Sequence, residues 1–145
     1  MFESINDFAA DKFTATKWDT AGQKVKFARQ FIRFVESDFD KSQFPVWFYR
    51  RLSQCFSMIA HYNLHGFYET FFTSTEDKVR FLRQTLQHPC YGDPAFTYSD
   101  VERALKKWVM ANVVLFRYEN LLADEHETAE RADLARLQVK YGVKG

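Results

Sequence analysis

The chain has 145 residues, of which 20 are Lys or Arg and 19 are Asp or Glu, so its formal net charge is +1. This balance excludes the strong overall field that draws a protein onto nucleic acid or an anionic membrane. The longest apolar run, residues 108–116, is far shorter than the roughly 20 residues that span a bilayer. We therefore expect no membrane partner, and the length predicts one domain over residues 1–145.

Aromatic residues indicate the fold class. The chain has 16 Phe, 7 Tyr and 3 Trp, most of them at helical spacing, against only 5 Gly and 3 Pro. Because no strand-like alternation competes, we predict an all-α, single-domain bundle of four to five helices with a long C-terminal helix. The two cysteines lack metal-type spacing, and residues 1–7 are acidic where a secretory signal would be basic. These features favour a cytoplasmic protein with reduced thiols.

The first helix is expected over residues 20–38, after an N-terminal segment of about residues 1–19. Thr20 and Gln23 have the spacing of a capping box, in which each side chain satisfies a free backbone N–H at the helix start. The 3.6-residue period predicts a broad buried face made of Val25, Phe27, Ala28, Phe31, Ile32, Phe34, Val35 and Phe39. Such a wide face should contact two neighbouring helices.

The second helix is expected over residues 44–72, because Pro45 suits a first helical turn and the apolar pattern continues past Gly66. Gly66 weakens a helix, so we expect a kink there and not a loop. A third helix should cover residues 75–88 and end before Pro89. The following segment, residues 89–94, contains two of the three prolines and is the best candidate for a functional loop.

The last helix is expected over residues 99–141, opened by a second capping box at Ser99 and Glu102. Its buried stripe should be formed by Val101, Leu105, Trp108, Asn112, Leu115 and Phe116. From Asp124 onward the composition becomes polar and alanine-rich, so the helix either projects beyond the core or is broken near residue 123. This sparsely apolar segment is the part that we expect to pack on another chain.

Chemical motifs are few. His61, His65 and Glu69 are spaced by four residues and would share one helix face, which makes them weak metal-ligand candidates, although a solvated face has the same pattern. Cys55 falls on an apolar face and reads as a core residue, whereas Cys90 follows His88 in the loop and reads as an ordinary loop thiol. No catalytic or cofactor motif is visible, so we expect a non-enzymatic protein without a cofactor.

Two binding hypotheses remain. The first is a protein–protein interaction module whose partner is another protein or a second copy of the chain. Its predicted contact residues are Glu119, Asp124, Glu125, Glu127, Glu130, Asp133, Leu134 and Leu137. Small helical proteins of this kind include accessory or inhibitory proteins of mobile elements, an association that no residue demonstrates. The alternative is nucleic-acid binding by basic side chains interleaved with rings, namely Lys26, Arg29, Arg33, Arg50 and Arg51.

Overall fold

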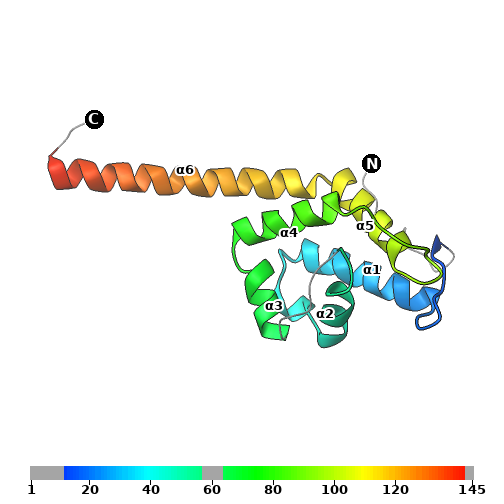
Figure 1. The fold of residues 1–145 in the computed structure, drawn as a ribbon. Coiled ribbons are helices and arrows are strands. Elements are labelled where there is room, and N and C mark those ends of the chain that lie inside the picture. Colours follow the sequence, from blue (N-terminus) through cyan, green and yellow to red (C-terminus); the bar gives the residue numbers. More distant parts are fainter. Residues whose placement is uncertain (1–11, 57–63, 143–145) are drawn as a thin grey trace.

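The computed structural model describes residues 12–56 and 64–142, and these residues form helices, turns and loops without a strand. The six α-helices are α1 (Ala21–Glu36), α2 (Val46–Leu52), α3 (Leu64–Phe71), α4 (Thr75–Gln87), α5 (Ser99–Ala111) and α6 (Val114–Tyr141), with a 3-10 turn η3 (Lys41–Gln43). Helices α1 to α5 form a compact body, and α6 runs along α4 and then continues past it (Figure 1). The predicted all-α bundle with a long C-terminal helix is confirmed.

Helix α1 begins at the predicted capping box. The Thr20 hydroxyl accepts the Gln23 N–H at 3.1 Å, and the Gln23 side chain accepts the Thr20 N–H at 2.6 Å. The helix ends at Glu36, two residues before the expected end, because Asp38 takes a left-handed conformation with φ 60°. The N–H groups of Asp38 and Phe39 then bond back to Val35 and Phe34, which is the Schellman arrangement usually built on glycine.

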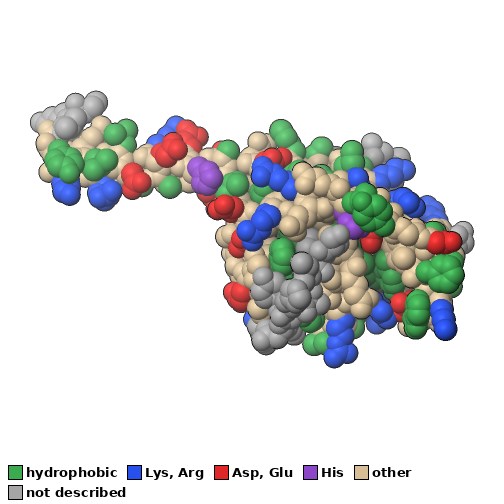
Figure 2. Space-filling view, in the orientation of Figure 1, with side chains coloured by type: hydrophobic (Ala, Val, Ile, Leu, Met, Phe, Trp, Pro, Cys, Tyr) green, Lys and Arg blue, Asp and Glu red, His purple; other side chains and the backbone are tan. Residues whose placement is uncertain are grey.

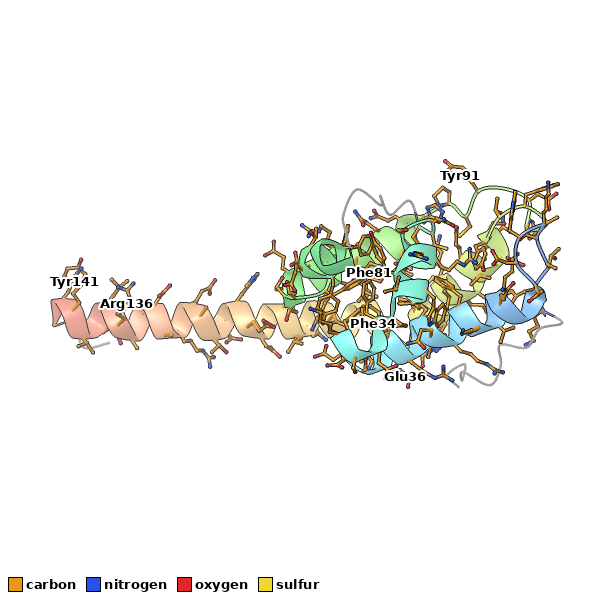
Figure 3. The ribbon with its side chains drawn as sticks, turned by 90° about the horizontal axis from the view of Figure 1, so that it is seen from below. Phe34, Glu36, Phe81, Tyr91, Arg136 and Tyr141 are labelled. Carbon is orange, nitrogen blue, oxygen red and sulfur yellow. The ribbon has the colours of Figure 1, made fainter. Side chains whose placement is uncertain are left out.

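Aromatic rings fill the core around α1. The Phe34 ring lies 4.8–5.6 Å from the rings of Phe39, Phe44, Phe48 and Phe72. Figure 3 shows Phe34 and Phe81 pointing into the space between the helices. Ring pairs of this kind add about 0.5–1.5 kcal/mol each beyond the area that they bury. The predicted buried face of α1 is confirmed at every position.

The prediction of a single kinked helix over residues 44–72 was wrong. Helix α2 ends at Leu52, and the N–H groups of Gln54 and Cys55 bond to carbonyls only three residues earlier, which tightens the chain into a turn. Phe56 then takes a left-handed conformation with φ 55°, yet its side chain is buried. Burial of this ring compensates for a backbone conformation that the sequence pattern does not reveal. The apolar pattern of residues 44–72 also predicts Ile59 and Tyr62 in the core, and both lie outside the described residues.

The prediction of a second capping box at Ser99 and Glu102 was also wrong. Ser99 is the first residue of α5 and not its cap, and its hydroxyl donates to the Gly92 carbonyl at 2.8 Å. The Glu102 carboxylate is buried, with Oε2 2.9 Å from Nε2 of His88. Both side chains therefore hold the loop between α4 and α5 against the body. Tertiary contacts have overridden the local pattern.

The long helix is broken near residue 113, not near residue 123. Asn112 ends α5, with its side chain donating to the Trp108 carbonyl at 2.9 Å, and Val113 is left-handed with φ 49°. Helix α6 then runs without interruption from Val114 to Tyr141. The break rotates the apolar pattern, so Phe116 is 62% exposed where the continuous helix would bury it.

A buried lysine fastens the loop between α4 and α5 to α1. The Lys24 side chain is fully buried, and its ammonium group donates to the carbonyls of Pro94 and Thr97 at 2.8 and 2.9 Å. Its third bond, at 2.9 Å, reaches Oδ1 of Asp100 on α5. All three ammonium hydrogens are thus used, which is the condition for keeping a charge inside a protein.

Candidate protein interface

The base of α6 is fixed to the body by packing and by polar contacts. Tyr118 is buried and Leu122 is half-buried against the core. Arg83 of α4 lies 2.8 Å from the Glu119 carboxylate, and the Thr75 hydroxyl donates to Glu125. These contacts cover the first three turns of α6 and set its direction along α4.

Beyond this base, α6 leaves the body. Every residue from 123 to 141 is exposed except Gln138, which is half-buried, and the helix extends well past α4 in Figures 1 and 3. Good helix formers dominate this segment, and Arg131 lies 2.6 Å from Glu127 one turn earlier. Local propensity and pairs of this kind stabilise the helix without help from the core.

The predicted acidic residues divide into two groups. Glu119 and Glu125 contact the body through Arg83 and Thr75. The exposed group on the projecting part consists of Asp124, Glu127, Glu130 and Asp133. Figure 2 shows acidic side chains on the part of the projection nearer the body and basic side chains toward its tip. The projecting helix therefore carries opposite charges along its length.

One exposed face of α6, which we call the outer stripe, follows the alternating three- and four-residue spacing of a coiled-coil seam. It consists of Phe116, Asn120, Ala123, Glu127, Glu130, Leu134, Leu137 and Tyr141, all of them exposed. The predicted contact residues Leu134 and Leu137 are 57% and 40% exposed, and Tyr141 is 66% exposed. The helical period places this stripe on the side of α6 opposite Tyr118 and Leu122, hence away from the body.

The basic residues of the nucleic-acid alternative lie on α1 and α2, two helices that contact each other. Lys26, Arg33 and Arg50 are exposed, and Arg29 is half-buried. Arg51 lies 2.5 Å from the buried Asp19 carboxylate, and the Lys26 ammonium covers the Trp47 ring at 4.4 Å. Lys26, Trp47 and Arg51 line a small hollow of about 140 Å³, which also includes Gln23.

The structure describes only part of the predicted metal site, but it places Cys55 fully. His61 and the side chain of His65 lie outside the described residues, and Glu69 is exposed on α3. Among residues 12–56 and 64–142, no group of three or more His, Cys, Asp or Glu side chains is placed to hold a metal ion. Cys55 is buried, as predicted, and burial raises its pKa well above the usual thiol value.

The loop thiol is not activated by its histidine neighbour. Cys90 is buried, and its backbone takes a left-handed conformation with φ 58°. Its Sγ lies 3.6 Å from the His88 carbonyl oxygen, whereas the His88 ring faces Glu102. Burial and the Glu102 charge raise the Cys90 pKa, which disfavours the reactive thiolate. A shallow cavity of about 520 Å³ opens beside this thiol, lined also by Pro89, Arg103, Lys106, Lys107, Met110 and Ala111.

Three features of the site were missed by sequence reasoning. Phe116 was assigned to the core because the break at Val113 was not visible in the sequence. Tyr118 and Asp38, whose hydroxyl and carboxylate lie 2.6 Å apart, are separated by 80 residues. The outer stripe has a signal that was available: its spacing is a heptad repeat, with polar residues in the middle that concealed the apolar ends.

Comparison with known proteins gives no relative for this chain: no family model, curated protein or solved structure matches it. Within the described part of the chain, no helix has the length and apolar character needed to cross a membrane.

Proposed function

We propose that this protein acts by binding another protein chain along α6, with the helical body holding the base of that helix in place. The observation that carries the proposal is the outer stripe. It presents four large apolar side chains to solvent on a helix that leaves the body, namely Phe116, Leu134, Leu137 and Tyr141.

Burial of these side chains supplies the driving force. Covering a side chain such as Leu134 or Leu137 removes apolar area from water and is worth about 1.5–3 kcal/mol when burial is complete. Single exposed apolar residues are ordinary, but a set aligned along one helix face is the pattern that helix-binding partners recognise. The neighbouring charges would set orientation and speed of encounter more than affinity.

Nucleic-acid binding by α1 and α2 is the weaker alternative. At least two of its five basic side chains already have intramolecular partners, since Arg51 pairs with Asp19 and Lys26 covers Trp47. A ring whose face is covered by an ammonium group is a poor stacking platform for a base. Affinity for single-stranded nucleic acid that falls steeply with salt would revive this alternative.

A photo-crosslinking amino acid placed at position 137, in the cells that make the protein, tests the proposal. The expected result is a protein adduct whose mass identifies the bound chain. The matched control is position 139, where Val139 is 85% exposed on the same segment but off the outer stripe. No adduct at position 137, or equal adducts at both positions, would contradict an interface at the outer stripe.

A further inference from the structure

We infer that the chain bound to the outer stripe is a second copy of this protein, whose α6 lies antiparallel to the first. The inference rests on the proposed function and adds the identity of the partner and the register of the contact.

The stripe is long enough for a self-complementary contact. Helix α6 has 28 residues and is about 42 Å long at 1.5 Å per residue. Its seam spacing is kept from Phe116 to Tyr141, which spans nearly four heptads. A two-fold axis through the middle of the stripe makes the same surface serve both copies, as in most homodimers.

The large apolar side chains lie at the two ends of the stripe, and the antiparallel pairing brings two rings together at each end. In the antiparallel pairing, Tyr141 of one copy lies opposite Phe116 of the other. Leu137 lies opposite Asn120, and Leu134 lies opposite Ala123. Each large side chain thus meets a ring or a smaller side chain, which is the alternation that seams between helices require.

Charges on the two flanks of the stripe are complementary in this register. It pairs the residues of one copy with those of the other as Arg131 with Asp124, Lys140 with Glu119, and Asp133 with His126. Glu119 also contacts Arg83 of its own body. All of these side chains are at least partly exposed in the single chain. The two-fold axis produces each pair twice, so four ion pairs and two contacts between a histidine and a carboxylate border the seam.

A parallel pairing lacks this complementarity of charge on the flanks of the stripe. It would place Glu119 beside Asp124 of the other copy and His126 beside Arg131. Like or non-complementary groups would then line both flanks, and such contacts disfavour one helix orientation against the other. The flanking charges therefore favour the antiparallel arrangement, in which Lys140 at the tip of each helix meets Glu119 at the base of its partner.

The centre of the seam limits the affinity. Glu127 of one copy lies opposite Glu130 of the other, so four carboxylates gather near the two-fold axis. Arg131 offsets part of this repulsion because it already lies 2.6 Å from Glu127 in its own helix. We therefore expect a reversible dimer, which Glu130→Ala should tighten.

The two bodies do not compete for space in this arrangement. The outer stripe faces away from Tyr118 and Leu122, through which α6 packs on its own body. Each body therefore lies on the outer side of the helix pair and at the opposite end from the other. The tip of each helix reaches the base of its partner, where Phe116 is exposed.

Disulfide trapping with purified full-length protein tests the register. We would prepare Ala123→Cys and Leu134→Cys as separate variants; the native Cys55 and Cys90 are buried and serve as the background in the unsubstituted chain. The expected result is a crosslinked dimer when the two variants are mixed and oxidised, with several-fold less when either is oxidised alone. Self-crosslinking of each single variant would overturn the antiparallel register in favour of a parallel one.

Charge exchange gives a second readout that does not depend on new thiols. Arg131→Glu should weaken the dimer roughly 2- to 30-fold, because two exposed ion pairs are lost per dimer. Asp124→Arg combined with Arg131→Glu should recover part of this loss, since the pair is restored with its signs exchanged while Glu127 still lacks its contact with Arg131. Failure of the double variant to recover affinity would overturn the assigned contact.

Failure of this inference can be told apart from failure of the proposed function. A monomer that forms no disulfide, while position 137 crosslinks in cells to a different protein, would overturn the second copy as partner and leave the interface in place. No disulfide together with no adduct at position 137 would overturn both.

Discussion

The Tyr118 hydroxyl donates a 2.6 Å hydrogen bond to Oδ1 of Asp38, which joins the base of α6 to the turn that ends α1. The same Asp38 oxygen lies 3.2 Å from the Lys78 ammonium of α4. Asp38 can present its carboxylate there because it occupies the left-handed position of the Schellman turn. A strained turn residue thus sets where the projecting helix begins its path along the body.

Replacing Tyr118 by Phe should lower the free energy of unfolding by about 1 kcal/mol, because one hydrogen bond to a partly exposed carboxylate is lost while the ring stays packed on Phe39. Urea denaturation followed by circular dichroism measures the change. Asp38→Asn should cost less, because the amide oxygen still accepts the hydroxyl. An unchanged midpoint for Tyr118→Phe would show that the bond does not anchor α6.

Lys24→Met should be far more damaging, at about 3–5 kcal/mol, because it leaves the Asp100 charge without its buried partner. Two loop carbonyls lose their donor as well. Lys26→Met is the matched control on the same helix, since it removes an exposed ammonium and one contact with Trp47, worth about 0.5–1 kcal/mol. Thermal melting should rank the two variants clearly, and equal effects would be inconsistent with a structural role for the buried ammonium.

The Glu102 carboxyl should make stability depend on pH. Burial raises its pKa above the ordinary value of 4.5, and His88 offsets part of this shift. Just above pH 4.5 the folded chain therefore binds more protons at this site than the unfolded chain, so this contribution to stability falls as pH rises. Relative to Glu102→Gln, the wild type should lose stability on going from acidic to neutral pH, and a difference that stays constant would contradict the buried carboxyl.

Removing the projecting part of α6 should leave the body intact. A chain that stops after His126 keeps Tyr118, Leu122 and the Glu119 pair with Arg83, so its melting temperature should match that of the full chain under conditions where both are monomeric. Its helical signal should fall, because residues 127–141 are helical. A chain that stops after Val113 loses Tyr118 and Leu122 and should be destabilised. Equal loss of stability in both truncations would mean that the tip supports the body.

How far the sequence predicts the fold can be judged from its helix ends. The Thr20 and Gln23 pair predicted the start of α1 because both partners of that capping box are local. The same pattern failed at Ser99 and Glu102, because Gly92 and His88 supply stronger partners from elsewhere in the chain. Local patterns predict local contacts only where no tertiary partner competes.

The helix breaks follow the same logic. Phe56 and Val113 adopt left-handed backbone conformations that are costly for such residues, and no glycine or proline marks either place. Burial of the Phe56 ring compensates for one of these conformations, and packing of α6 on α4 fixes the other. The contacts that stabilise these two conformations form only in the assembled core, so the periodicity of the sequence cannot predict them.

The candidate site was predicted in part. Leu134, Leu137 and the acidic residues were predicted as contact residues because composition alone shows where a helix runs out of core side chains, and the structure shows these two leucines exposed. Phe116 could not be assigned to the same stripe until the break at Val113 fixed the rotation of α6.

Sedimentation velocity over a range of protein concentrations shows whether a second copy of the protein covers the outer stripe. Wild type and Leu134→Asp with Leu137→Asp would be compared with Ala132→Asp with Val139→Asp, a matched pair that lies off the stripe on the same exposed segment. If a second copy covers the stripe, the wild type and the off-stripe control should be dimers, and the stripe variant should be a folded monomer. Three proteins that sediment alike, or dissociation caused by the off-stripe pair alone, would contradict it.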